Sequence, residues 1–468
     1  MNEEFNELTA EVVDELRARL GGGNVRLDDE AIEIYASDET EDFVFRPGVV
    51  VFPRSTEHVS AVMRIATAAR IPVTPRAGGT GLSGGALPVF GGIALSVEHL
   101  DEIIEIDQNN LMAVVRPGVI TQELQEAVEK VGLYYPPDPA SRGSCRLGGN
   151  LAECAGGPHA VKYGVTKDYV LGIEAVLPDG TVVHHGGKLL KNSTGYNLTQ
   201  LIIGSEGTLA VITKIFLKLI PLPRHRITLL VPFPALEAAA RTVPAIMNAG
   251  ITPSALEFME REAIKITERH LDVAIPNSDS AAQLIIELDG NDESLIAREA
   301  ERVCEIALEE GAADVLLADS SARQKEIWDM RRATGEAVKS LSVYKEEDTV
   351  VPRYNLVPLL TGVKEIAARH GIKTVCYGHA GDGNLHVNIL KMEMSDEDWN
   401  TSLRTAIVEI FDLTVKLGGT ISGEHGIGYT QKPFLPIAFT PEEIELMRRI
   451  KSAFDPMGIL NPGKIFPD

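Results

Sequence analysis

The sequence predicts an α+β protein with two domains, and three observations carry this prediction. The chain has 468 residues, which is more than one ordinary hydrophobic core organises. Up to about residue 220, short apolar and β-branched runs end in glycine or proline turns, as strands do. After Pro221 and Pro223, single strands alternate with long amphipathic helices. We therefore expect a domain boundary near residue 220.

The first half is predicted to be rich in strands. We expect strands at 49–53, 71–75, 93–97, 103–107, 112–115, 173–177, 181–184 and 208–219. Helices are expected at 5–20, 56–69 and 121–131, with Thr56 and Thr121 as N-caps of the last two. Residues 136–158 are rich in Pro, Gly and Ser without a periodic pattern, and a loop of that length is usually functional.

The second half is predicted to be a sheet with long helices on one face. Strands are expected at 227–231, 283–287, 314–317, 348–351, 374–378 and 386–390. Helices are expected at 235–248, 293–310, 323–341, 356–370 and 396–417.

Composition excludes several classes of protein. Hydrophobic residues make up 44% and charged residues 24%, as in soluble globular enzymes. The net charge of −23 disfavours binding to nucleic acid or anionic membranes. No segment approaches the roughly 20 apolar residues that span a bilayer, and the acidic start is unlike a secretory signal or a transit peptide. We expect a cytoplasmic protein, with peripheral association at the inner membrane left open.

The four cysteines are scattered and form no C-x-x-C pair. They are Cys145, Cys154, Cys304 and Cys376. This spacing argues against a disulfide framework and against a cysteine-ligated iron–sulfur cluster. We expect reduced thiols.

Two glycine-rich segments near the C-terminus carry the clearest signal for chemistry. They read HAGDGNLHVN (379–388) and SGEHGIG (422–428). Two histidines and one carboxylate, here His379, His386 and Glu424, form a recurrent ligand set for a divalent metal. The adjacent His425 can accept a proton. The alternative is a set of hydrogen-bonded structural histidines.

The spacing of the two histidines requires a bend between them. His379 and His386 lie seven residues apart, and an odd separation along one strand points side chains to opposite faces. Gly381 and Gly383 can supply the bend, because glycine tolerates a positive φ.

Glycine-rich turns recur in the first half. PRAGGTGLSGG (75–85) follows a predicted strand, and it is neither a P-loop nor a G-x-G-x-x-G motif opening a helix. By itself it is also compatible with a surface turn. RLGGNLAECAGG (146–157) and GSEGTLAVIT (204–213) are further turns of this kind. Together they favour a long ligand that lies over many backbone amides, such as a dinucleotide.

The order of the motifs resembles a known family. PRAGGTGLSGG, PPDPAS (136–141), LGGNLAECAGG, YGVTKDYVLG (163–172) and IGSEGTLAVIT resemble the FAD domain of vanillyl-alcohol-oxidase-type flavoenzymes. The two histidine segments and the ending FDPMGILNPGKIF resemble one branch of these enzymes. That branch comprises D-lactate dehydrogenases, glycolate oxidase catalytic subunits and D-2-hydroxyglutarate dehydrogenases. The resemblance covers residues 38–466.

The resemblance implies the domains and the cofactor contacts. Residues 1–220 would form a PCMH-type FAD-binding domain, completed by 455–468, and 221–454 a ferredoxin-like α+β cap that binds substrate. The implied FAD contacts are Pro75, Arg76, Ala77, Gly78, Gly79, Thr80, Gly81, Pro137, Asp138, Pro139, Ser141, Gly148, Gly149, Gly156, Tyr163, Gly164, Glu206, Gly207, Ile212 and Asn461. Many relatives attach flavin to a histidine after the glycine pair. Because Gly79-Thr80-Gly81 stands there, we expect non-covalent FAD.

The resemblance also implies roles in catalysis. His379, His386 and Glu424 would bind a divalent metal, Zn²⁺ or Mn²⁺. His425 would be the general base, and the hydride would pass to flavin N5. In WDMRRATG (328–335), Arg331 would bind the substrate carboxylate, with Arg332 as the alternative and a solvated helix charge as the simpler reading of either. Independently of the resemblance, Asn388 lies two residues beyond His386 and therefore on the same strand face, which makes it a candidate orienting donor to the substrate.

The substrate is expected to be a small D-2-hydroxy acid. Hydroxyglutarate dehydrogenases tend to carry a lysine before a D-x-x-x-P stretch, and here Glu346 stands at that place. An acid there should repel a dicarboxylate, which favours D-lactate or glycolate. D-2-hydroxyglutarate stays open, because Lys345 is only one residue away.

The sequence also leaves two other functions and the electron acceptor open. The alternatives are a non-redox transferase like alkyl-dihydroxyacetone-phosphate synthase and a flavin-free metallohydrolase. No cysteine cluster can reoxidise the flavin, so we expect a separate acceptor: an iron–sulfur subunit, an electron-transferring flavoprotein, a quinone or a cytochrome. A homodimer is left open.

Overall fold

The computed structural model describes residues 5–40 and 43–468. Within these, the chain forms two compact units. Unit 1 contains the described residues up to Gly156 together with Val165–Leu222 and Glu424–Asp468, and unit 2 contains Gly157–Gly164 and Pro223–Gly423. The expected boundary near residue 220 lies close to Leu222. The segment that returns to unit 1 begins at Glu424 and is therefore longer than the expected 455–468.

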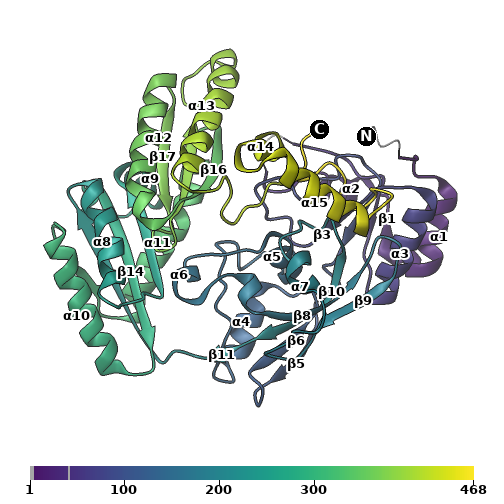
Figure 1. Ribbon diagram of the computed structural model, residues 1–468, viewed down its shortest axis with the longest axis horizontal. Helices are drawn as coiled ribbons and strands as arrows, with labels where there is room; N and C mark the ends of the chain where they lie inside the picture. Colours follow the sequence, from purple (N-terminus) through teal and green to yellow (C-terminus); the bar gives the residue numbers. More distant parts are fainter. Residues whose placement is uncertain (1–4, 41–42) are drawn as a thin grey trace. The chain divides into compact units, whose positions relative to one another are not determined.

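The first sheet of unit 1 has four strands in the order β1-β2-β4-β3. These are β1 (Val25–Arg26), β2 (Val49–Val51), β4 (Ile93–Ser96) and β3 (Val73–Arg76), of which β2 and β3 run parallel to β4. Helices α1 (Ala10–Leu20) and α3 (Thr56–Ala69) pack against each other (Figure 1) and share an apolar core with this sheet. The sheet positions the glycine-rich loop that follows β3.

The second sheet of unit 1 has five antiparallel strands in the order β5-β6-β10-β8-β9. These are β5 (Ile103–Asp107), β6 (Met112–Val115), β10 (Val211–Lys218), β8 (Val170–Val176) and β9 (Val182–Gly186). A small pair joins β7 (Leu133–Tyr134) to β11 (Ile220–Pro221). The other helices of the unit are α2 (Asp29–Ile34), α4 (Thr121–Glu129), α5 (Leu147–Glu153), α7 (Leu198–Ile202), α14 (Leu435–Ala438) and α15 (Pro441–Phe454). Short 3-10 turns lie at Gly22–Asn24, Thr166–Asp168 and Lys432–Phe434.

Unit 2 is built on a seven-stranded antiparallel sheet in the order β15-β12-β14-β13-β17-β18-β16. The strands are β15 (Leu316–Ala318), β12 (His225–Phe233), β14 (Ala282–Gly290), β13 (Ala255–Glu260), β17 (Lys373–Gly378), β18 (Asn384–Leu390) and β16 (Tyr344–Val350). Strand β13 and the helix that follows it were not predicted from the sequence.

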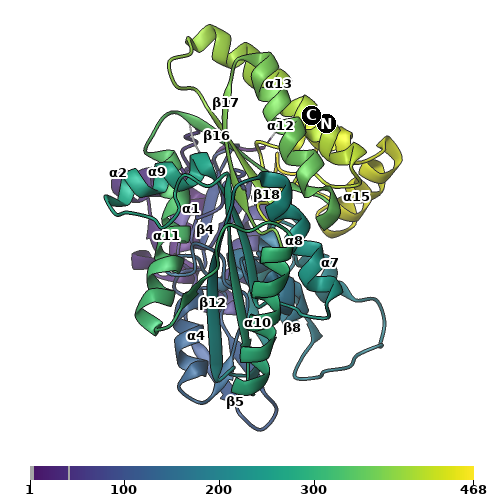
Figure 2. The same ribbon diagram turned by 90° about the vertical axis from the view of Figure 1, so that its left-hand side faces the viewer.

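Helices cover both faces of this sheet, so the expectation of helices on one face was wrong. Figure 2 shows α9 (Arg261–Leu271) and α11 (Ser321–Lys339) on one side of β12, with α8 (Leu236–Asn248) and α10 (Glu293–Glu309) on the other. Helix α12 (Leu356–His370) packs on α8 and on α13 (Asp396–Lys416). The physical reason is that β13 and β14 are buried at consecutive positions, so both faces need cover. The short helix α6 (Ala160–Tyr163) and a 3-10 turn at Arg353–Asn355 complete unit 2.

The expected N-caps were displaced by one residue. Ser55 caps α3, because its side-chain oxygen accepts from the backbone N–H of His58 at 3.3 Å. Thr56 instead donates to Oε1 of Glu174 at 2.6 Å. Ile120 occupies the cap position of α4, and the Thr121 hydroxyl accepts from Asn150 at 2.6 Å. Both threonines tie the helix start to neighbouring elements.

Among the described helices, none combines the length and the apolar character that a membrane span requires.

Candidate active site

Unit 1 contains a cavity of about 420 Å³ beside the glycine-rich loop. Its walls come from residues 75–82 after β3, from 139–155 around α5 and from 202–212 before β10. Glu424 and His425, on the returning segment, also line it. Residues more than 200 positions apart in sequence therefore meet at one cavity within this unit.

The loop after β3 presents free backbone donors. The amides of 78–82 donate no hydrogen bond to another described residue. Gly79 has a φ of +67°, and a Cβ there would lie 2.3 Å from Nη2 of Arg76. Successive unpaired N–H groups form a concavity for anions such as a pyrophosphate. The loop therefore fits the phosphate end of a dinucleotide.

Most of the predicted cofactor residues line this cavity. They are Pro75, Arg76, Ala77, Gly78, Gly79, Thr80, Gly81, Pro139, Ser141, Gly148, Gly149, Glu206, Gly207 and Ile212. Others of unit 1 lie just behind the wall: the Pro137 carbonyl accepts from Gln125, and Asn461 donates to the carbonyls of Gly85 and Glu206. Gly156 packs against Glu424, since a Cβ there would lie 2.9 Å from Oε2 of Glu424. The cofactor-binding roles of all these residues, and of Asp138, stay predictions.

Two polar wall residues were missed by the sequence reading. The hydroxyl of Ser205 and Oε2 of Glu153 are buried without a hydrogen-bond partner in the described structure. Burial raises the pKa of Glu153 well above its ordinary value, and the nearby charge of Glu206 raises it further. The signal for Glu153 in the sequence is that it is the one acid in the otherwise uncharged segment LGGNLAE (147–153).

The turn that carries His425 is fixed within unit 1. The Ser83 hydroxyl donates to the carbonyl of His425 at 2.9 Å. The Glu206 carboxylate accepts from the backbone N–H groups of Ile427 at 2.8 Å and Gly428 at 2.6 Å. These bonds hold the backbone that directly follows the imidazole at the cavity wall.

In unit 2, a hairpin brings His379 and His386 together. His386 pairs with Tyr377 across β17 and β18, and His379 directly follows β17. The ring centroids of the two histidines are 5.3 Å apart. Gly383 has a φ of +85°, as expected for the bend, whereas Gly381 has no positive φ. Because the chain reverses between the two histidines, their rings lie together. An odd separation within one uninterrupted strand would have pointed them to opposite faces.

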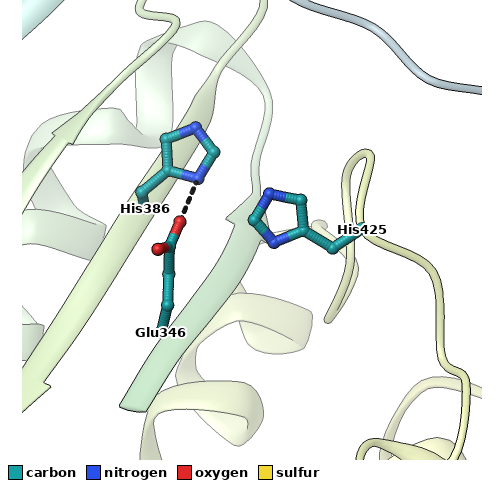
Figure 3. Close-up of side chains that lie close together, drawn as sticks. All are labelled: Glu346, His386 and His425. Carbon is teal, nitrogen blue, oxygen red and sulfur yellow. Dashed lines mark ion pairs between the residues drawn. The ribbon is translucent and has the colours of Figure 1, made fainter. Parts of the chain in front are cut away.

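Each imidazole has a carboxylate beside Nδ1. Nδ1 of His379 lies 2.7 Å from Oε1 of Glu257. Nδ1 of His386 lies 3.2 Å from Oε1 of Glu346, the pair drawn in Figure 3, and 3.8 Å from Asp348. Burial raises the pKa of Glu257, but the electrostatic interactions with His379 and Arg331 outweigh burial and lower it.

This donor arrangement fits a divalent cation. Metal-bound histidines usually donate their second N–H to a carboxylate, which leaves the other nitrogen for the metal. Both histidines are buried, at 7% and 5% exposed, and a carboxylate oxygen lies beside Nδ1 of each, hydrogen-bonded in His379 and at ion-pair distance in His386. Nε2 of each ring is therefore the nitrogen that could bind a metal.

Arg331 is the inward member of the arginine pair. It is 7% exposed, its Nη2 lies 2.7 Å from Oε2 of Glu257, and its guanidinium lies 5.0 Å from the Tyr377 ring centroid. Arg332 is exposed and lies over Trp328 on the helix surface. Asn388 is fully buried on the same strand face as His386, and its amide donates to the Val375 carbonyl.

Two families match the chain, and together they span most of it. "FAD binding domain" matches residues 47–186, and "FAD linked oxidases, C-terminal domain" matches residues 222–465. The chain belongs to the FAD-linked oxidases. It is an FAD-dependent oxidoreductase with an α+β fold.

Full-length relatives of this FAD-linked oxidase have related names. Glycolate oxidase subunit GlcD of Bacillus subtilis is 40% identical, with 92% of each chain covered. D-lactate dehydrogenase of Anaerostipes hadrus is 38% identical, with 99% of this chain and 98% of the relative covered. D-2-hydroxyglutarate dehydrogenase of Stutzerimonas stutzeri is 34% identical, with coverage of 97% and 98%.

Solved structures support the fold of the FAD-linked oxidase. p-Cresol methylhydroxylase with substrate bound has a TM-score of 0.79 at 18% identity, covering 98% of this chain and 96% of that one. 4-Ethylphenol oxidase from Gulosibacter chungangensis has a TM-score of 0.78 at 20% identity, covering 99% of each chain.

The remaining predicted cofactor residues of the FAD-linked oxidase, Tyr163 and Gly164, lie in unit 2. The Tyr163 hydroxyl donates to the carboxylate of Asp289, with both oxygens at 2.9 Å, and Lys162 bonds the same group. Gly164 has a φ of +82°. Their contact with FAD stays a prediction.

Proposed function

We propose that this FAD-linked oxidase converts a small D-2-hydroxy acid, D-lactate or glycolate, into the 2-oxo acid. The observation that carries the proposal is that His425, a proton acceptor, lines the same cavity as the glycine-rich loop. A base at the wall of a flavin cavity suits oxidation of an alcohol carbon. Bound FAD would accept the hydride at N5, and a divalent cation would act as a Lewis acid on the hydroxyl.

His425 would take the hydroxyl proton. A neutral imidazole, whose ordinary pKa is about 6.5, is suited to this near neutral pH. Ser83 and Glu206 hold the backbone from which the imidazole extends, so the side chain starts from a fixed position on the cavity wall. Placing a base in advance lowers the entropic cost of the proton transfer.

Zn²⁺ or Mn²⁺ would be held by His379, His386 and Glu424. The two buried imidazoles with carboxylates on Nδ1 support the first two ligands. For Glu424 the support is chain connectivity. The amide of Gly423 donates to Oδ2 of Asp348 at 2.8 Å, and Asp348 lies beside His386. Glu424 is the next residue after Gly423, and consecutive Cα atoms are only about 3.8 Å apart.

Arg331 would bind the substrate carboxylate, with Asn388 as an orienting donor. The guanidinium is buried, and its Nε has no hydrogen-bond partner in the described structure. A buried unpaired donor costs free energy unless a ligand satisfies it. A planar carboxylate matches the fork of N–H groups.

The surroundings of His386 favour a substrate with a single carboxylate. Glu346 pairs with His386, and a second substrate carboxylate near it would be repelled. Lys345 pairs with Ile389 and directly precedes Glu346 in β16, so its side chain points to the sheet face opposite to that of Glu346. The lysine would need a register shift to bind a dicarboxylate.

Electrons would leave the flavin for a separate acceptor. The four cysteines are free and lie apart in sequence. An iron–sulfur subunit, an electron-transferring flavoprotein, a quinone or a cytochrome would therefore have to reoxidise FAD.

Turnover with a dye acceptor tests the proposal. The purified protein should reduce the dye with D-lactate or glycolate, form the matching 2-oxo acid, and favour these acids over L-lactate and D-2-hydroxyglutarate. Acid precipitation should release free FAD, because no histidine lies in Gly79-Thr80-Gly81. A preference for D-2-hydroxyglutarate would overturn the substrate assignment, and no oxidation of any of these acids would overturn the function.

A further inference from the structure

We propose that Glu257 is a positioning residue that serves two parts of the active site at once. One carboxylate oxygen determines which ring nitrogen of His379 carries the proton, and the other oxygen holds Arg331 in place. The inference rests on the proposed function, in which His379 binds the metal and Arg331 binds the substrate carboxylate.

Glu257 stands where an acid is costly. It lies in β13, near the middle of the sheet, between Ala255 and Met259 on the same face, and it is fully buried. Burying an ionised carboxylate is strongly unfavourable unless partners compensate the charge. The compensating partners of Glu257 are His379 and Arg331.

The contact with His379 selects a tautomer. An ionised carboxylate can only accept hydrogen bonds, so the 2.7 Å contact requires the proton on Nδ1 of His379. Nε2 then keeps its lone pair for a cation. Without this carboxylate, the ring could carry its proton on Nε2 and could not bind a metal through it.

The contact with Arg331 is an ion pair that leaves hydrogen-bonding capacity free. Nη2 lies 2.7 Å from Oε2, yet Oε2 receives no well-aligned N–H and Nε of Arg331 has no partner in the described structure. The Tyr377 ring lies 5.0 Å from the guanidinium and restricts it further. The guanidinium is thus fixed by charge while its donors stay available to a ligand.

A neighbouring carboxylate provides a matched control. Glu287 lies on β14, on the same sheet face, and is fully buried beside His159 at 3.4 Å and Arg226 at 3.2 Å. It therefore shares the chemistry of Glu257 but contacts no residue with a predicted site role. Removing its charge should disturb packing to a similar degree.

The test compares Glu257→Gln with Glu287→Gln. In Glu257→Gln the amide offers one acceptor and one donor, so it cannot serve both partners as the carboxylate does. Zn²⁺ affinity of the metal-depleted protein, measured by equilibrium dialysis, should fall about 10- to 100-fold. KM for D-lactate should rise, while FAD content stays that of the wild type. Glu287→Gln should retain wild-type Zn²⁺ affinity and KM.

The outcomes separate this inference from the proposed function. Wild-type Zn²⁺ affinity and KM in Glu257→Gln would overturn the inference, as would equal losses in both variants. If Glu257→Gln does not fold, Glu257→Asp keeps the charge but shortens the reach, and unchanged affinity and KM there would overturn it equally. Failure of the wild-type protein to oxidise D-lactate or glycolate would instead overturn the proposed function.

Discussion

The chemistry at single residues depends on where protons and charges are held. His425 is fixed by its backbone, whereas His379 and Arg331 are fixed through their side chains by Glu257. Residues set in glycine-rich motifs were found from the sequence because their surroundings are unusual. Glu257 was not, because a lone acid between apolar residues has no motif, and its role depends on partners 74 and 122 positions away.

Replacing His425 tests the proton acceptor. His425→Ala should bind FAD normally, because His425 is one of many residues that line the cavity. Flavin reduction by D-lactate should slow by about 100-fold or more, since positioned general bases contribute about 10²–10⁴-fold. Rapid-mixing absorbance under anaerobic conditions measures this rate. A wild-type rate in His425→Ala would refute the assignment.

Arg331→Lys tests the carboxylate site while keeping a positive charge beside Glu257. Lysine lacks the planar fork of arginine, so kcat/KM for D-lactate should fall about tenfold or more. Arg332→Lys is the matched control, because Arg332 is exposed one position along the same helix. Steady-state kinetics with a dye acceptor measures both. A loss confined to Arg332→Lys would move the role to that residue.

At the scale of elements, regular periodicity was predicted well and buried polar strands were not. The limits of α3 agree with the expectation, because its apolar positions recur with helical spacing. Strand β13 was missed, since ALEFME has two acids in six residues and all six are buried. The sheet tolerates them only because His379, Arg331 and Lys364 compensate their charges.

The hairpin between β17 and β18 should depend on Gly383. A Cβ at this position would lie 2.0 Å from the carbonyl of Val351, and the φ of +85° is unfavourable for other residues. Gly383→Ala should therefore lower the free energy of unfolding by more than the about 1–2 kcal/mol of backbone strain alone and weaken Zn²⁺ binding, as urea denaturation and dialysis would measure.

Gly371→Ala is the control for this prediction. Gly371 also has a positive φ, of +63°, but a Cβ there would meet nothing within 4 Å. Its cost should be only the backbone strain, about 1–2 kcal/mol, with unchanged Zn²⁺ affinity. Equal destabilisation by the two variants would refute the steric argument for Gly383.

Glu287 should make the stability of unit 2 depend on pH. Burial raises its pKa, but the hydrogen bond from His159 and the charge of Arg226 outweigh this and lower the pKa from 4.5 to about 2. A lowered folded-state pKa stabilises the fold above the ordinary pKa, and this contribution is lost as the pH falls from 4.5 toward 2. It amounts to about 3 kcal/mol at most, at about 1.4 kcal/mol for each pKa unit.

Urea denaturation of the wild type and Glu287→Gln over this range measures the effect. The stability difference between them should be largest above pH 4.5 and should shrink as the pH approaches 2. A difference that is independent of pH would contradict the assignment.

At the scale of the whole molecule, the order of the motifs predicted the family and composition did not. Hydrophobic content and net charge are compatible with many soluble enzymes. The order of the glycine-rich turns and histidine segments along the chain resembles that family, and the two family matches cover both halves of the chain. Cavity walls and buried ion pairs lay beyond the sequence, because they depend on contacts between distant segments.

The central claim is that the α-carbon of a D-2-hydroxy acid reduces the flavin of this chain. Rapid mixing of the FAD-loaded protein with D-lactate, without oxygen or another acceptor, tests it most directly. The absorbance of oxidised flavin should disappear, more slowly when the acid carries deuterium at C2, and pyruvate should form in equal amount. An unchanged flavin spectrum with both D-lactate and glycolate would contradict the claim.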